Sequence, residues 1–191
     1  MVFSCYDTVV IYIALLRAVN VGGRNLLSMS ELTSLFNSLG FHGARTMLQS
    51  GNVVFSCAGG SAASLERRLE RETRNHFKIP VEYFVHTLPQ WRTIVDRNPF
   101  SREAKSDPGH LIVVVLKKAA TPKAAAILAA ALRGPERIRV EGKTAYIIYP
   151  EGQGRSKLTP AVIERALGSK GTARNWNTVL KLLTLASSTA G

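Results

Sequence analysis

Cysteine is scarce in this sequence, and the scarcity limits the chemistry that the chain can carry. Cys5 and Cys57 are the only two cysteines, they lie far apart, and their spacing matches no metal-binding or redox motif. We therefore expect two free thiols in a reducing compartment, as in a cytoplasmic protein. The four histidines are scattered, with no cluster of cysteine or aspartate beside them, so the sequence predicts neither a metal site nor a cofactor.

Acidic residues are also few. The chain has 13 Asp and Glu against 25 Lys and Arg, which gives a formal net charge of +12. This excess favours partners that carry phosphate or an acidic surface. A basic surface that binds no partner is an equally good interpretation. With 46% hydrophobic and 20% charged residues, the chain otherwise has the composition of a folded globular protein.

Long hydrophobic runs are lacking as well. The run Val9–Leu16 is rich in branched and aromatic residues but is much shorter than a bilayer requires, so we expect no membrane span. It predicts a buried β-strand instead. Residues 1–8 carry Asp7 and no positive segment, so we expect no secretory signal. The chain turns polar directly after the run, and a site is expected where this strand ends.

The remaining residues predict an order of strands and helices. Ser28 with Glu31 three residues later forms a capping box, and Gly40 suits the left-handed end of a helix. Apolar residues at four-residue spacing predict a second helix, and Gly51 and its neighbours predict a hairpin turn. The elements expected in the first half, residues 8–86, are strand 9–16, helix 28–40, strands 46–48 and 53–55, helix 62–77 and strand 81–86.

The second half, residues 87–186, repeats this order. It begins with a short helix capped by Thr87 and a polar loop from Ser101 to Gly109. Its other expected elements are strand 111–116, helix 122–133, strands 138–140 and 144–149, helix 160–168 and a terminal helix 175–186. We therefore predict an α+β fold of two ferredoxin-like βαββα(β) halves with antiparallel or mixed sheets, a C-terminal helix and a disordered tail at 187–191.

Polar residues gather in three loops of this predicted fold. One loop, between a strand and a helix, contains Gly152, Gly154, Arg155, Ser156 and Lys157. Its glycines let consecutive backbone N–H groups point the same way and its cations add charge, so an anion could bind there. The spacing is not that of a Walker motif. In the alternative interpretation, the glycines only turn the strand into the helix.

The other two loops also have two interpretations. The connection after the first strand contains Arg17, Asn20, Gly22 and Gly23, without the three-glycine spacing of a dinucleotide fingerprint. Residues 172–178 contain Arg174, Asn175 and Asn177. We expect Asn175 to cap the terminal helix while Arg174 and Asn177 reach outward. Each loop could bind a ligand or could serve the fold alone.

These motifs carry a resemblance to a known family. The segments LLRAVNVGGRN, LQSGNVVF, GRSKL and TARNWNTVLKLLTLA, between Ile11 and Ala186, resemble the signature segments of the bacterial family catalogued as domain of unknown function 1697. The resemblance implies a cytoplasmic α+β protein with duplicated ferredoxin-like halves. It implies no established activity, substrate or cofactor.

Enzyme chemistry has little support in the sequence. No Gly-x-Ser-x-Gly elbow is present, and Ser50 has a simpler role in a turn. Most carboxylates lie beside arginines, which indicates solvated ion pairs rather than a tuned acid and base. The sequence therefore favours, without deciding it, a protein that is not an enzyme.

Three functions stay open. The first is a binder of phosphate-bearing ligands, nucleic acid or nucleotide, at a basic cleft where the three loops meet, supported by the arginines between Arg67 and Arg74. The strands lack the aromatic pattern of an RNA-recognition motif. The second is an enzyme that acts on a small phosphate-bearing molecule. The third is a structural or protein-interaction module in which the motifs serve folding.

Overall fold

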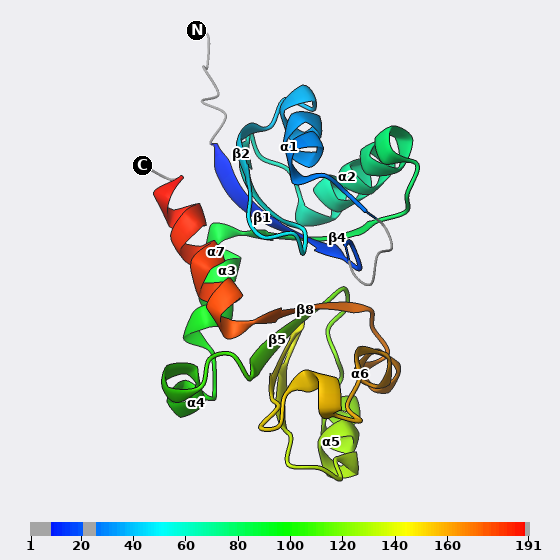
Figure 1. Cartoon of the computed structure of the whole chain (residues 1–191), viewed down its shortest axis with the longest axis vertical. Coiled ribbons are helices and arrows are strands. Elements are labelled where there is room, and N and C mark those ends of the chain that lie inside the picture. The colour runs from blue at the N-terminus through cyan, green and yellow to red at the C-terminus, as the bar shows by residue number, and fades with distance from the viewer. Residues whose placement is uncertain (1–8, 21–25, 190–191) are drawn as a thin grey trace, which may run out of the picture. The chain divides into compact units, whose positions relative to one another are not determined.

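The computed structural model describes residues 9–20 and 26–189, which form two compact units (Figure 1). One unit extends to Arg92 and also includes the chain from Leu182 onward, and the other comprises Thr93–Lys181. The predicted boundary, between residues 86 and 87, precedes the helix α3 (Leu88–Asp96), whereas the two units divide within this helix. Each unit contains one four-stranded sheet.

The first unit is a ferredoxin-like fold. Its sheet has the order β2-β3-β1-β4 with antiparallel neighbours, and α1 and α2 lie on one face of it (Figure 1). The elements are β1 (Val10–Arg17), α1 (Met29–Ser38), β2 (His42–Thr46), β3 (Asn52–Cys57), α2 (Ala62–Phe77) and β4 (Glu82–Thr87).

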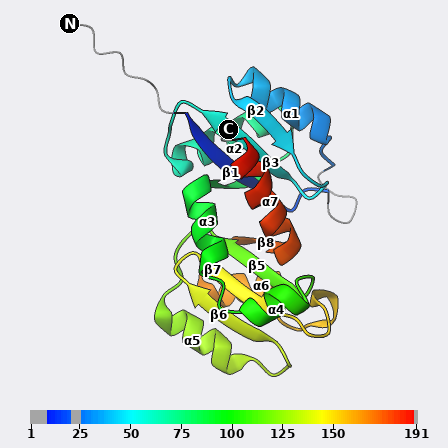
Figure 2. The same cartoon turned by 90° about the vertical axis from the view of Figure 1, so that its left-hand side faces the viewer.

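The second unit repeats this topology, with the order β6-β7-β5-β8 and with α5 and α6 on one face of an antiparallel sheet (Figure 2). The predicted α+β fold with two ferredoxin-like halves is thereby confirmed. The elements are α4 (Ser101–Ser106), β5 (Leu111–Leu116), α5 (Pro122–Ala131), β6 (Arg137–Glu141), β7 (Thr144–Ile148), the 3-10 turn η1 (Gln153–Arg155), α6 (Pro160–Leu167), β8 (Gly171–Asn175) and α7 (Trp176–Ser188).

Helix ends follow the capping residues of the sequence. Ser28, Thr121 and Thr159 each accept a hydrogen bond from the backbone N–H three residues on, at 3.1–3.4 Å. Gly168 ends α6 in the left-handed conformation, with φ 64°. These local signals therefore set where the helices begin and end.

The inner strands β1 and β5 are each buried on both faces of their sheets, which explains their continuous apolar sequences. In β1, Tyr12, Ala14 and Leu16 pack in the core beneath α1 and α2, and the alternate residues Ile13 and Leu15 are equally inaccessible. The residues of β5 behave in the same way: Ile112, Val114 and Leu116 belong to the core shared with α5 and α6, and Leu111, Val113 and Val115 are buried on the other face.

The structure corrects several predicted elements. The expected loop after Pro99 contains the helix α4, because Ser101–Ser106 is a short run of helix-forming residues. The first hairpin strand ends at Thr46 instead of beginning there. Residues 171–175 form the edge strand β8 rather than a loop, because they pair with β5.

The terminal helix α7 also differs from its prediction. Its buried residues include Leu182 and Ala186, whereas Leu180 is 38% exposed. The helix extends to Ser188, so the tail predicted from Ser187 begins inside it, and residues 190 and 191 lie outside the described part. Among the described helices, none is long and apolar enough to cross a membrane.

Candidate functional site

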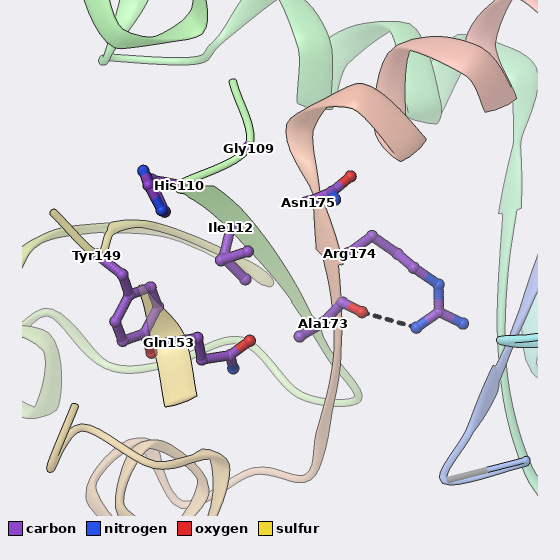
Figure 3. Close-up of a pocket in the computed structure, with 8 residues that line it drawn as sticks. All are labelled: Gly109, His110, Ile112, Tyr149, Gln153, Ala173, Arg174 and Asn175. Atoms are coloured by element: carbon purple, nitrogen blue, oxygen red, sulfur yellow. Dashed lines mark hydrogen bonds between the residues drawn. The ribbon is translucent and has the colours of Figure 1, made fainter. Parts of the chain in front are cut away.

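A pocket of about 320 Å³ lies at one end of the second sheet (Figure 3). Residues at the start of β5, after β7 and at the end of β8 converge there. Ile112 and Ala173 supply apolar surface, and His110 and Gln153 supply polar groups. The complete lining is Gly109, His110, Ile112, Tyr149, Gln153, Ala173, Arg174 and Asn175.

The pocket joins two of the three predicted loops. Gln153 comes from the loop after β7, and Arg174 and Asn175 come from the end of β8, so residues about twenty positions apart meet because β7 and β8 flank the same strand β5. Arg155 and Ser156 instead line a second recess, of about 20 Å³, together with Glu136. Gly152 lines this recess as well, whereas Gly154 and Lys157 line neither pocket.

The loop after β7 is held by its own hydrogen bonds. Gly152, with φ 83°, donates its N–H to the carbonyl of Tyr149 at 2.9 Å. The Ser156 hydroxyl donates to the Glu136 carboxylate and accepts the N–H of Leu158 at 2.9 Å, so this predicted site residue has a structural role. Its neighbours Arg155 and Lys157 are exposed, and within the described ranges neither forms an ion pair.

Arg174 is buried, contrary to the expectation that it reaches outward, and is only 8% exposed. Its Nη1 donates to the Thr172 hydroxyl at 2.9 Å and to the Ala173 carbonyl at 2.7 Å. The guanidinium extends away from the side chains of His110 and Gln153 (Figure 3). Burial lowers the pKa of Arg174 to about 10.

The neighbouring asparagines have separate roles. Asn175 caps α7 as predicted, because its Oδ1 accepts both the N–H and the hydroxyl of Thr178 at 2.9 Å. Asn175 also lines the pocket, and its amide Nδ2 is a hydrogen-bond donor. Asn177 is exposed on the first turn of α7 and does not line the pocket.

His110 is one of the lining residues that were not predicted as site residues. The imidazole Nδ1 of His110 lies 2.7 Å from Asp107 Oδ2. The backbone N–H of His110 also donates to the backbone carbonyl of Asp107, at 3.2 Å. Because a carboxylate only accepts, Nδ1 carries the proton of this contact. A Cβ placed on Gly152 would lie 3.9 Å from Nε2, so this second nitrogen faces the loop after β7. The turn Asp107-Pro-Gly-His110 directly before an apolar strand is the signal that could have identified the pair.

Tyr149 forms part of the floor of the pocket, and its hydroxyl is already bonded within the protein. Its hydroxyl donates to the Leu158 carbonyl at 2.9 Å, and the side chain is 1% exposed. Burial, with a smaller effect of the Glu136 charge, raises its pKa to about 12. No group of three His, Cys, Asp or Glu residues in the described chain is placed to bind a metal ion.

Comparison with known protein families identifies the family of this chain. A family model described as a protein of unknown function, DUF1697, matches residues 10–146. The chain belongs to the DUF1697 family. The resemblance noted in the motifs is thereby confirmed.

The fold of this DUF1697 chain is shared with a solved structure, the conserved bacterial protein SP0830 from Streptococcus pneumoniae. The two have a TM-score of 0.72 and 19% sequence identity, and the match covers 93% of this chain and 99% of the other. At this identity the likeness shows the fold. No curated protein matches the chain.

In the DUF1697 chain, the loop after β1 belongs to the first unit, and its described residues are bonded to neighbouring elements. Arg17 pairs with Glu82 at 2.9 Å. Asn20 donates to the carbonyls of Leu27 and Gln49, at 3.0 and 2.8 Å, and accepts the Leu27 N–H at 2.7 Å. These contacts connect the loop to the hairpin between β2 and β3. Gly22 and Gly23 lie outside the described residues.

Proposed function

We propose that the second unit binds a small phosphate-bearing ligand, of nucleotide size, in the pocket at the end of its sheet. The observation that carries this proposal is the meeting of two of the three predicted loops at one pocket, through Gln153 and Asn175. The volume of about 320 Å³ lies at the lower end of the range for small-molecule sites. An apolar floor with a few polar groups is also typical of such sites.

Charge favours an anionic ligand. The chain carries a net charge of +12, and Arg155 and Lys157 follow Gln153 in the same loop, exposed and without ion pairs in the described ranges. Two exposed cations in this loop can neutralise a phosphate while the pocket holds the rest of the molecule. A cytoplasmic location, where phosphorylated metabolites abound, is part of this proposal and agrees with the buried free thiol of Cys57.

Nucleic acid is a second candidate ligand, favoured by the surface of α2. Arg67 and Arg74 are exposed there and form no ion pair in the part of the chain that the structure describes. Arg68, in contrast, donates to the Leu39 carbonyl and lies 5.0 Å from the centre of the Phe41 ring, so it supports the fold. A binding surface on α2 would act through backbone phosphates and would weaken with salt.

Thermal shift measurements test the proposal. AMP and ATP should raise the melting temperature progressively as their concentration increases, and adenosine, without phosphate, should raise it less. The double variant Arg155→Ala, Lys157→Ala should weaken the effect of AMP about tenfold. The matched variant Lys123→Ala, Arg133→Ala removes the same charge from the region of α5 and should leave it unchanged.

The outcomes separate the candidates. No shift with any nucleotide or sugar phosphate would remove the small-ligand proposal and favour a structural or protein-interaction module. Binding of oligonucleotides that is lost on Arg67→Ala and Arg74→Ala, but not on the loop substitutions, would favour nucleic acid on α2.

A further inference from the structure

The four outer strands of the two sheets differ in how their free edges are protected. The strand orders leave β2 and β4 at the edges of the first sheet and β6 and β8 at the edges of the second. An edge strand presents backbone groups that can pair with another chain, and proteins usually block it. Outward N–H groups of β4 and β8 have side-chain acceptors and β2 has a bulge, whereas β6 has neither feature in the part of the chain that the structure describes.

Side chains block β4. Leu16 donates its N–H to the carbonyl of Gly51, next to β3, so the even-numbered residues of β1 face β3 and the odd-numbered ones face β4. Through the register of β1 with β4, the backbone groups of Tyr83, Val85 and Thr87 then point outward. All three N–H groups have a side-chain acceptor. Tyr83 donates to Glu70 at 3.1 Å, Val85 to Glu66 at 2.9 Å and Thr87 to Gln90 at 2.9 Å.

The edges β8 and β2 are blocked in two other ways. In β8, the N–H of Gly171 donates to Glu164 at 3.0 Å, and the carbonyl of Ala173 accepts Nη1 of Arg174 at 2.7 Å. In β2, the register with β3 shifts between His42 and Arg45, with the intervening Gly43 at φ 60°. This bulge twists the strand and interrupts a regular ladder.

The edge of β6 is regular, and its outward N–H groups are open. Tyr149 donates its N–H to the carbonyl of His110, so the odd-numbered residues of β7 face β5 and the even-numbered ones face β6. Through the register of β6 with β7, Arg137, Arg139 and Glu141 bond to β7, and the backbone groups of Ile138 and Val140 point outward. Among the described residues, no acceptor lies within hydrogen-bond distance of either outward N–H.

The side chains of β6 indicate the charge of a partner. Arg137 and Arg139 are exposed on the face opposite Ile138, which is buried in the core, but Arg137 already pairs with the carboxylate of Glu103 on α4. Nη1 of Arg139 lies 3.3 Å from the outward carbonyl of Ile138, so this cation is at the edge itself. The chain as a whole has a net charge of +12, which disfavours a second copy and favours an acidic strand.

We propose that β6 binds an extended, acidic segment of a partner protein by strand addition. The outward N–H groups of Ile138 and Val140 supply the donors of the ladder, and Arg139, at the edge itself, selects an acidic residue of the added strand. This interaction is independent of the pocket, since Ile138 and Val140 do not line it.

A short capped peptide in which Asp and Val alternate is the probe, with a fluorescent label for anisotropy. The wild-type chain should bind it in the micromolar to millimolar range. Val140→Pro removes one outward N–H without touching the bonds to β7, and it should abolish binding, whereas Val140→Thr keeps the N–H and should retain it. Arg139→Glu should weaken binding about tenfold.

Two further measurements make the test decisive. The same peptide with methylated backbone nitrogens should not bind, because it cannot donate to the ladder, and urea unfolding checks that each variant is folded. Absence of binding at about 1 mM peptide, or equal binding by the wild type and Val140→Pro, would overturn the proposal. A concentration-dependent dimer that Val140→Pro abolishes would overturn it too, because the occupant would then be a second copy.

Discussion

The carboxylate of Glu164, on α6, accepts a hydrogen bond from the backbone N–H of Gly171, on β8, at 3.0 Å. The first unit contains the corresponding contact, from Tyr83 on β4 to Glu70 on α2, at 3.1 Å. The two units therefore repeat a chemical device as well as a topology. In each, a glutamate on the second helix occupies the edge of the last strand.

We predict that Glu164→Ala lowers the free energy of unfolding by about 1 kcal/mol, because the N–H of Gly171 loses its acceptor. The uncovered edge should also increase self-association, which light scattering would detect at raised concentration. Glu164→Gln keeps an acceptor oxygen and should restore most of both properties. Equal stability of the Ala and Gln variants in urea unfolding would contradict this role.

A second prediction compares the contributions of two asparagines, Asn20 and Asn177, to the stability of the fold. Asn20 makes three hydrogen bonds to Leu27 and Gln49 and has a left-handed backbone, at φ 54°. Asn20→Ala should lower the free energy of unfolding by roughly 2–3 kcal/mol. Asn177→Ala, at an exposed position of α7, should change it by less than about 0.5 kcal/mol. Urea unfolding of the two variants, side by side, measures the difference, and equal losses would contradict it.

Elements with a strong local pattern could be predicted from the sequence. The range predicted for α2 agrees with the structure at both ends, since apolar residues at four-residue spacing and a following proline define it. The continuous apolar run of β5 was equally clear. The strand β8 could not be predicted in this way, because its residues Gly171–Asn175 are mostly polar and their pairing with β5 connects positions about sixty residues apart.

The site was harder to predict because it depends on these distant pairings. The charged and amide residues of the motifs suggested a binding role, yet Arg174 is turned into the protein by its register position on β8, opposite Val113. His110 belongs to no motif and reaches the pocket only because β5 lies between β7 and β8. The composition of the chain indicated the charge of a ligand, but the positions of the polar groups at the pocket are set by the pairing of strands in the sheet.

A third prediction concerns alkaline pH. Burial raises the pKa of Tyr149 from its ordinary value of 10 to about 12, so the folded protein holds this proton more tightly than the unfolded chain does. The resulting stability is present below pH 10 and is lost as the pH rises from about 10 to 12, by up to roughly 2–3 kcal/mol.

Tyr149→Phe isolates this effect. At pH 7 it should cost about 1 kcal/mol, because the Leu158 carbonyl loses its donor. The difference between wild type and variant should then shrink above pH 10 and reverse in sign towards pH 12, since phenylalanine cannot ionise. Urea unfolding at pH 7, 10 and 11 measures it, and a difference that stays constant over this range would contradict the prediction.

The last prediction concerns the pair of His110 and Asp107 at the pocket, and it depends on the proposed function. Asp107 orients the imidazole through Nδ1, at 2.7 Å, and leaves Nε2 facing the loop after β7. A ligand in the pocket should therefore form one hydrogen bond with Nε2, and His110→Ala should weaken AMP binding about five- to tenfold. Asp107→Asn keeps the imidazole but changes its orienting partner, so a smaller loss is expected.

His42→Ala is the matched control, because it removes an exposed histidine of the first unit. It should leave AMP binding unchanged. His110 is only half-buried, so its substitution should change the free energy of unfolding without ligand by less than about 1 kcal/mol. If AMP binds equally to the wild type and to His110→Ala but is lost on the substitution of Arg155 and Lys157, the ligand contacts the loop and not the histidine. If His110→Ala and His42→Ala weaken AMP binding equally, the effect of each is unspecific and the orienting role of Asp107 has no support.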